Sequence, residues 1–157
     1  MQFRTATLSE LDAVYELVLR LAESQRAMAS RLDLKDNPLS LRLHLARQLV
    51  DDGVIIALDG AQLIGVVTFH RLDDSLGRTE SIGLIEHLFV DADHRDRGIG
   101  GTLLEHAEQA LIDRGVSIVE LEVMAVNTDA WRFYETRGYR PHRIRLSKRV
   151  GGDQSEW

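Results

Sequence analysis

Three glycines within four positions are the residues of this sequence whose spacing most directly suggests chemistry. Gly98, Gly100 and Gly101 follow an apolar run typical of a strand and open an amphipathic helical pattern. Closely spaced glycines let the backbone turn tightly and approach a ligand without side-chain obstruction. Their N–H groups and those of the first helical turn then point to one spot, where the helix dipole favours negative charge. The pattern predicts a site for a diphosphate, with a compact strand-to-helix turn as the alternative interpretation.

Two familiar phosphate-binding loops are excluded by the residues that follow these glycines. A P-loop requires lysine before Ser or Thr, whereas Gly101 is followed directly by Thr102. The dinucleotide fingerprint requires a third glycine where Leu103 stands. A different phosphate-bearing cofactor is therefore expected.

The charged residues beside the glycines fit the same interpretation. Arg95 and Arg97 are suited to phosphate oxygens, because a guanidinium group binds them with paired, charge-assisted hydrogen bonds. Asp93 and Asp96 offer an alternative partner for both arginines. The sequence leaves this choice open.

Composition excludes several classes of function. The chain has 157 residues, no cysteine and a net charge of −6, so disulfides, thiolate metal cages and a cysteine nucleophile are absent and general affinity for nucleic acid is not expected. The N-terminus lacks the pattern of a secretory signal, and the longest apolar run, residues 63–69, is too short to span a bilayer. We therefore expect a cytoplasmic protein without a membrane partner. Four scattered histidines show no paired ligand spacing, so we predict surface or structural roles for them and no metal site: His44, His70, His106 and His142.

The first half of the chain predicts one strand, two helices and a hairpin. Residues 3–6 form a short strand pattern, and residues 7–10 match a capping box that opens a helix ending near Gln25. A second helix begins at Asn37-Pro38 and ends at Gly53. Two β-rich runs, residues 54–58 and 63–69, are joined around Asp59-Gly60, which predicts a hairpin.

The second half predicts a strand-helix-strand unit, a short helix and a last strand. Their expected bounds are residues 82–90, 98–114, 116–123, 127–137 and 139–150, the last with Ile144 and Leu146 on one side. Such a unit requires a parallel strand pair joined by a right-handed crossover. The expected fold class is α/β (α+β), with a mixed, mostly antiparallel central sheet and helices on both faces. Residues 1–150 are predicted to form a single domain, and residues 151–157 a flexible tail.

The segment Arg95-Asp96-Arg97-Gly98-Ile99-Gly100 resembles the Arg/Gln-x-x-Gly-x-Gly/Ala signature of the GCN5-related N-acetyltransferases, the GNAT family. Upstream, Leu88-Phe89-Val90-Asp91 resembles the strand that precedes this signature. Downstream, Asn127 and Phe133-Tyr134-Glu135 with Gly138-Tyr139 resemble the second cofactor segment of the family. The order of elements matches over residues 3–150.

The resemblance implies an acetyl-CoA-dependent N-acetyltransferase whose parallel strands splay apart to admit the pantetheine arm. It implies direct transfer to a primary amine of a small molecule or peptide in a ternary complex, with acceptor choice governed mainly by residues 25–37 and 72–81. A noncatalytic acyl-CoA-binding protein is the alternative, and homodimer formation stays open. The implied cofactor contacts are Leu88, Phe89, Val90, Arg95, Asp96, Arg97, Gly98, Ile99, Gly100, Gly101, Thr102, Asn127 and Tyr134.

Two catalytic residues are implied by the same resemblance. Neutralising an amine with a pKa near 10.4 at pH 7 costs about 4.6 kcal/mol, so a base is needed, and Glu86 is the candidate. Strand alternation places His87 on the opposite face from Glu86. Tyr134 is the candidate acid for the leaving thiolate. The alternatives are a structural ion pair for Glu86, packing for Tyr134 and a helix cap for Asn127.

Overall fold

The computed structural model describes residues 1–27, 37–72, 80–148 and 150. The helices and strands follow the order predicted from the sequence up to the last helix. They are β1 (Gln2–Thr5), α1 (Leu11–Arg26), α2 (Pro38–Val50), β2 (Val54–Asp59), β3 (Gln62–Arg71), β4 (Ile82–Val90), α3 (Ile99–Asp113), β5 (Ile118–Leu121) and α4 (Thr128–Glu135), with short 3₁₀ turns at Leu8–Glu10 and Ala92–His94.

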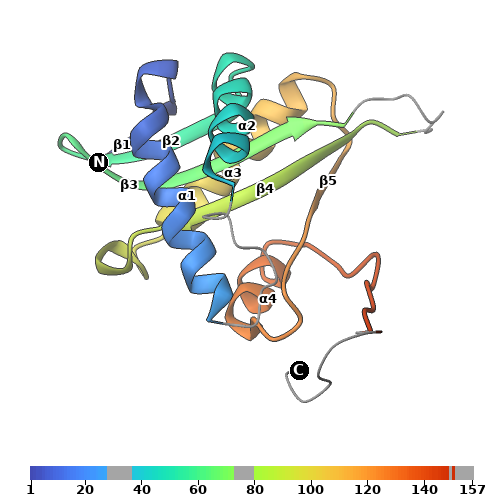
Figure 1. Ribbon diagram of the computed structural model, residues 1–157. Coiled ribbons are helices and arrows are strands. Elements are labelled where there is room, and N and C mark those ends of the chain that lie inside the picture. The colour runs from blue at the N-terminus through green and yellow to red at the C-terminus, as the bar shows by residue number, and fades with distance from the viewer. Residues whose placement is uncertain (28–36, 73–79, 149, 151–157) are drawn as a thin grey trace.

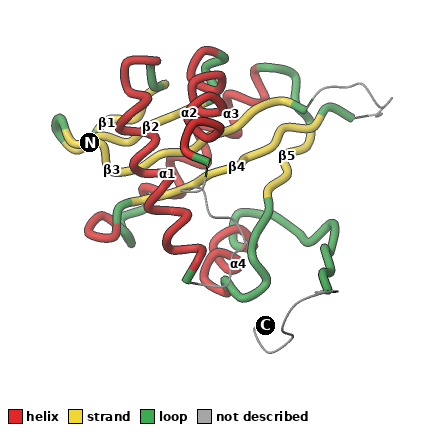
Figure 2. Tube along the Cα trace, in the orientation of Figure 1, coloured by secondary structure: helices red, strands yellow, loops and turns green. Residues whose placement is uncertain are grey.

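The five strands form one mixed sheet in the order β1-β2-β3-β4-β5. The first three pairs are antiparallel and β4 pairs with β5 in parallel. In chain order α3 connects β4 to β5, as a parallel pair requires, and Figure 2 shows it behind the sheet. The prediction of a mixed, mostly antiparallel sheet with one parallel pair is confirmed.

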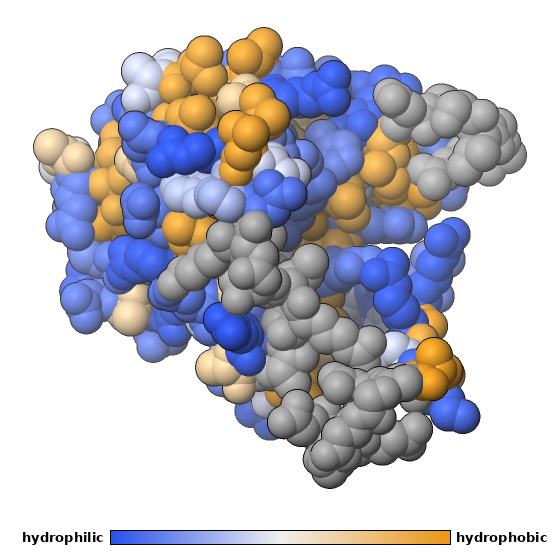
Figure 3. All heavy atoms as spheres, viewed as in Figure 1, coloured by the Kyte–Doolittle hydropathy of each residue, from blue (hydrophilic) through white to orange (hydrophobic). Residues whose placement is uncertain are grey.

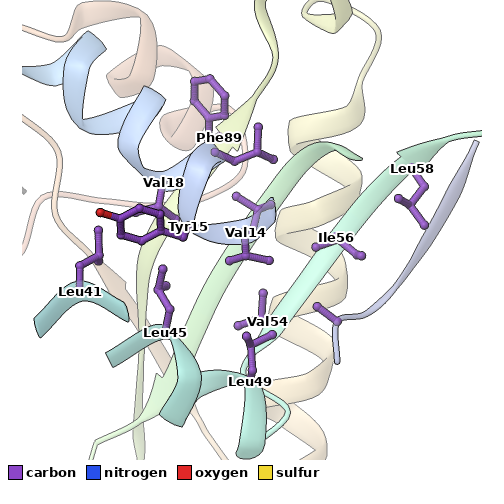
Figure 4. Close-up of a cluster of buried hydrophobic side chains, with 13 residues drawn as sticks. Val14, Tyr15, Val18, Leu41, Leu45, Leu49, Val54, Ile56, Leu58 and Phe89 are labelled. Carbon is purple, nitrogen blue, oxygen red and sulfur yellow. The ribbon is translucent and has the colours of Figure 1, made fainter. Parts of the chain in front are cut away.

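Helices cover both faces of the sheet, as predicted. The helices α1 and α2 lie on one face and α3 on the other (Figure 1). Figure 4 shows the core on the first face, where α1 and α2 pack on β2 and β4. Its members are Ala6, Val14, Tyr15, Leu17, Val18, Leu41, Leu45, Leu49, Val54, Ile56, Leu58, Val66 and Phe89. A second core on the α3 face includes Phe69, Ile85, Ile99, Leu103 and Leu111.

Local sequence explains where the N-terminal elements begin. Thr7 and Glu10 form the predicted capping box, and Glu10 also accepts hydrogen bonds from the Arg4 guanidinium at 2.6 and 2.9 Å. Asn37 caps α2 through its side chain, with Pro38 in the first turn, so both predicted helix starts are confirmed. The β2–β3 hairpin turns at Gly60, whose φ of 59° suits glycine.

The predicted last strand is wrong for the residues that the structure describes. No strand forms between residues 139 and 148, and the two apolar side chains expected on one side, Ile144 and Leu146, are 85% and 88% exposed. Alternating residues make a strand only where a neighbouring strand offers its edge. Here β5 ends at Leu121, and the chain then leaves the sheet for α4, so segment 139–148 has no paired neighbour.

The outer surface of α1 and α2 mixes apolar and charged residues (Figure 3). Leu39 and Leu43 of α2 are among its exposed apolar side chains. Within the described ranges, no helix has the length and apolarity needed to span a membrane. Most of the two segments implied to choose the acceptor, residues 25–37 and 72–81, and the predicted tail, residues 151–157, lie outside the described residues.

Candidate active site

A β-bulge places Glu86 at the centre of the candidate site. Thr68 of β3 pairs with His87 and Phe69 pairs with Ile85, so Glu86 is an extra residue on β4 without a partner on β3. An extra residue interrupts the alternation of side chains between the two faces. Glu86 consequently points toward α2, where its side chain is 19% exposed.

The Glu86 carboxylate is held by two side chains of α2. One oxygen, Oε2, lies 2.6 Å from His44 Nε2 and accepts a hydrogen bond from Gln48 Nε2 at 2.8 Å. His44 and Gln48 are four residues apart and therefore lie on one face of the helix. The other oxygen, Oε1, is 3.4 Å from His70 Nδ1 on β3. The site thus combines one carboxylate with imidazoles from two neighbouring elements.

His87 lies on the same face as Glu86, which corrects the expectation from strand alternation. Its Nδ1 is hydrogen-bonded to Thr68 Oγ1 at 2.7 Å. Thr68 is fully buried and pairs with Val54 of the α1/α2 core, so this contact is on the α2 side. Burial lowers the pKa of His87, and nearby His44 lowers it further, while Glu86 opposes the shift. The bulge is the reason that adjacent residues share one face.

The parallel strands separate just after Ile85, the residue before Glu86. Their pairing ends at Ile85 and Leu121, and Figure 1 shows β5 diverging from β4 with α4 beyond the opening. Asp91 N donates to Ile64 O of β3, and alternate residues of a strand direct their backbone groups to opposite edges. The backbone groups of Leu88 and Val90 therefore face the open edge, whereas those of Phe89 face β3.

The glycine loop presents unused backbone donors next to this open edge. Gly98 is the N-cap of α3 with a φ of 77°, and Asp96 also has a positive φ of 60°. Within the described part of the chain, the amides of residues 97–101 donate to no acceptor. The Thr102 amide instead closes the first helical turn on Gly98 O at 3.0 Å. A Cβ on Gly100 would lie 3.7 Å from Val90 Cγ2, so the loop is adjacent to the end of β4.

Four side chains fix the junction between β4 and the loop. Asp91 is buried and accepts a 2.6 Å hydrogen bond from Arg20 of α1. The Phe89 ring is flanked by the guanidinium groups of Arg20 and Arg95, at 5.6 and 5.7 Å. Arg95 Nε donates to Val90 O at 3.1 Å, which occupies one group of the open edge with a side chain of the loop. Arg97 is exposed and has no partner among the described residues.

Tyr134 of α4 lies at the other side of the opening. Its ring meets Phe133 and Tyr139 edge-on, at 5.0 and 5.6 Å between centroids. Its hydroxyl group has no hydrogen-bond partner among the described residues. Burial raises the pKa of Tyr134 to about 12, and the charge of Arg137 opposes the shift. The phenol is therefore protonated at neutral pH.

The start and end of α4 are fixed by local contacts. Asn127 caps the helix, because its Oδ1 accepts a hydrogen bond from Ala130 N at 3.1 Å. At the other end, Arg137 stacks on Phe133 at 3.9 Å and covers Gly101, where a Cβ would lie 2.6 Å from its guanidinium. The second cofactor segment implied by the resemblance thus packs against the glycine loop.

Sequence reasoning missed the α2 side of the site. His44 and His70 were expected to be surface or structural groups, whereas both lie against Glu86. A signal was present: His44 and Gln48 continue the apolar stripe of Leu41 and Leu45, where polar residues require polar partners. The described residues contain no group of three or more His, Asp or Glu side chains arranged to hold a metal ion.

Comparisons with known proteins agree with this arrangement. Residues 12–139 match the acetyltransferase (GNAT) family. Aminoalkylphosphonate N-acetyltransferase of Salmonella typhimurium is 30% identical over 149 residues, which cover 94% of this chain and 90% of that protein.

Solved structures show the same fold. The tetramutant of the BH1408 protein from Bacillus halodurans has a TM-score of 0.79 at 22% identity and covers 96% of this chain and 100% of its own. An aminoglycoside acetyltransferase, meta-AAC0020, from an uncultured soil metagenomic sample, in complex with sisomicin, has a TM-score of 0.69 at 20% identity and covers 96% of each chain. With the family matched over most of its length, the chain belongs to the GNAT family and is an acetyltransferase enzyme.

Proposed function

We propose that this enzyme transfers an acetyl group from acetyl-CoA directly to a primary amine of a small molecule or peptide, within a ternary complex. The observation that carries the proposal is the open edge of β4 beside the amides of residues 97–101, which have no acceptor among the described residues. Unpaired backbone groups are costly when buried, so both features favour a ligand that supplies acceptors and donors. Acetyl-CoA combines an amide-containing arm with a diphosphate.

The residues of the loop fit a diphosphate in charge and in space. The amides of residues 97–101 precede a 15-residue helix, whose N-terminus favours negative charge. Arg97 is exposed, and Arg95 lies between the loop and the strand. The absence of a Cβ atom at Gly98 leaves the backbone there open to approach. Thr102 contributes by closing the first turn, since its amide is already used.

The strand and α4 provide the remaining contacts of the proposal. Leu88 and the Val90 amide offer backbone groups to the pantetheine amides, while Phe89 anchors the strand in the core. Asn127 holds the start of α4 in place, and Tyr134 lies on the same helix between the rings of Phe133 and Tyr139. We propose that Tyr134 donates a proton to the departing sulfur. Without a cysteine in the chain, no acetyl-cysteine intermediate is available, which favours direct transfer.

The acceptor belongs on the other side of the opening, where the Glu86 carboxylate attracts a cationic amine. Among the relatives, one is named for aminoalkylphosphonates and one structure holds the aminoglycoside sisomicin. An amine panel for this enzyme should therefore include 2-aminoethylphosphonate, sisomicin and a short peptide with a free amino terminus.

Binding of acetyl-CoA is tested by the Gly100→Asp variant. A Cβ at this position meets Phe133 at 3.6 Å and Val90 at 3.7 Å, which is ordinary contact, so the fold accepts a side chain. A carboxylate beside the diphosphate repels it, and we expect the variant to lose the rise in melting temperature that acetyl-CoA gives. That rise reflects about 2.7 kcal/mol when the ligand is at 100 times its Kd. Gly100→Ala is the matched control, expected to keep the rise.

The outcomes separate the parts of the proposal. An unchanged rise in Gly100→Asp would refute the loop as the diphosphate site. Thiol release from acetyl-CoA in the presence of an amine of the panel supports the transferase. Tight binding of acetyl-CoA with no release for any amine would instead favour the noncatalytic acyl-CoA-binding alternative.

A further inference from the structure

We infer that His44 of α2 is the general base that accepts the proton of the acceptor amine, and that Glu86 positions it. The inference rests on the proposed function and assigns a catalytic role within the same site. It is carried by the hydrogen bonds around Glu86 and by the exposure of the two side chains.

The Glu86 carboxylate is already committed as a hydrogen-bond acceptor. Its Oε2 accepts from Gln48 at 2.8 Å and lies 2.6 Å from His44 Nε2. Two groups of α2 therefore already use this oxygen as an acceptor. The Glu86 side chain is 19% exposed, whereas the His44 side chain is 44% exposed. An incoming amine therefore reaches the imidazole more readily than the carboxylate.

The same contact fixes which imidazole nitrogen is free. An ionised carboxylate only accepts hydrogen bonds, so His44 Nε2 must carry the proton of the 2.6 Å contact. In the neutral imidazole, Nδ1 then holds an unshared lone pair. When Nδ1 takes up a proton, Glu86 stabilises the resulting imidazolium, as a carboxylate does in a Ser-His-Asp triad. Imidazoles as a class titrate near neutral pH, where a general base works best.

Other ionisable groups of the sheet are less suited to this role. His70 on β3 is 3.4 Å from Glu86 Oε1, a longer contact than that of His44. His87 on β4 is buried, its Nδ1 is hydrogen-bonded to Thr68, and burial lowers its pKa. His87 therefore stays neutral and adds no charge that opposes protonation of His44.

The side chains of α1 that contact α2 interact with Arg42 rather than with His44. Asp12 forms an ion pair with Arg42, and the Arg42 guanidinium lies 4.3 Å above the Tyr15 ring. The contacts that the structure gives His44 come from β4. The electrostatic partner that matters for its protonation is thus Glu86.

The proposed step balances as follows. His44 Nδ1 takes one proton from the acceptor ammonium, and the freed lone pair attacks the thioester carbonyl carbon. A C–N bond forms and the C–S bond breaks, with sulfur receiving a proton from Tyr134. Of the three ammonium protons, one stays in the amide, one passes through His44 to solvent, and one restores Tyr134. The products are the N-acetylated acceptor and free coenzyme A.

The test compares His44→Gln with His70→Gln, Glu86→Gln and the control His106→Gln. His106 is an exposed histidine of α3 on the other face of the sheet, stacked on Phe3. Thiol release is measured from pH 5.5 to 9 with saturating acetyl-CoA and the best amine of the panel. Calorimetry with acetyl-CoA and thermal unfolding report binding and folding separately, and His44→Asn serves as a second variant.

We expect His44→Gln to lower kcat/KM by about 10²-fold or more, with acetyl-CoA affinity unchanged. The rise of kcat/KM with increasing pH near neutrality should also be absent from this variant. Glu86→Gln keeps a side-chain oxygen that can accept the hydrogen bond from His44 Nε2–H. This variant should therefore lose less of kcat/KM than His44→Gln and retain the rise with pH. Retention of the rise in both His44 variants, or its loss in Glu86→Gln or His70→Gln instead, would overturn the inference while the function stands. If the wild type binds acetyl-CoA but acetylates no amine, the proposed function is refuted. The inference about His44 is then refuted as well, because it rests on that function.

Discussion

Replacing Tyr134 with phenylalanine tests the acid side of the reaction with little disturbance of the fold. The substitution removes one oxygen atom from a ring that packs edge-on against Phe133 and Tyr139. Because this hydroxyl has no hydrogen-bond partner among the described residues, its removal leaves no buried donor or acceptor unpaired there. We expect the free energy of unfolding to change by no more than about 0.5 kcal/mol.

The expected effect on turnover follows from the pKa of the phenol. Burial raises the pKa of Tyr134 to about 12, whereas an ordinary thiol has a pKa of about 8.5. Complete transfer to a solvated thiolate is then uphill by about 3.5 units, or roughly 5 kcal/mol. A thiolate leaving into the same buried opening is also poorly solvated, which raises its own pKa and narrows the gap. Proton donation is therefore less uphill inside the opening than to a thiolate in water, and removal of a general acid costs about 10²- to 10⁴-fold in rate.

The assay is thiol release at saturating amine and acetyl-CoA, with the Kd of acetyl-CoA measured by calorimetry. We expect kcat of Tyr134→Phe to fall at least 10²-fold, or about 2.7 kcal/mol in the activation barrier, with the Kd nearly unchanged. Tyr139→Phe is the matched control. It removes the same atom from a neighbouring ring, and it gives up a 2.6 Å hydrogen bond to Glu108. This control should lose about 1 kcal/mol of stability and retain turnover.

Two results would refute the reasoning. A kcat of Tyr134→Phe within tenfold of the wild type would show that sulfur receives its proton by another route, such as water. A loss of turnover in Tyr139→Phe as large as that in Tyr134→Phe would assign the effect to ring packing rather than to proton donation.

Two further predictions concern stability and its dependence on pH, measured by urea unfolding. The hydrogen bond from Arg4 lowers the pKa of Glu10 to about 2, so the unfolded chain takes up a proton first as the pH falls. This contribution is present above about pH 4.5 and is lost toward pH 2, and Glu10→Gln should lack it and be less stable at pH 7 by about 1 kcal/mol. Burial lowers the pKa of His87, so the unfolded chain again binds the proton first, and stability should fall as the pH drops below about 6.5. His87→Gln should flatten this slope, whereas an equal slope in both proteins would contradict the assignment.

Much of the fold could be predicted because its signals are local. The capping box at Thr7 and Glu10, the Asn37-Pro38 helix start and the turn at Gly60 each depend on residues within one turn of the chain. The glycine loop belongs to the same class, since the φ of Gly98 and the start of α3 follow from neighbouring residues. The segment 139–148 shows the limit of such signals, because its alternating pattern indicates a strand but supplies no partner.

The sequence by itself determined the order of helices and strands up to α4, the glycine turn before α3 and the family to which these residues point. Only the tertiary structure decided the surroundings of Glu86, because two non-local features set them. The bulge depends on the register between β3 and β4, and it turns Glu86 and His87 to one face. The contact with His44 joins residues 42 positions apart and depends on how α2 packs against the sheet. Side-chain spacing along one strand or helix predicts neither the bulge nor the contact between Glu86 and His44, because each forms only when separate elements pack together.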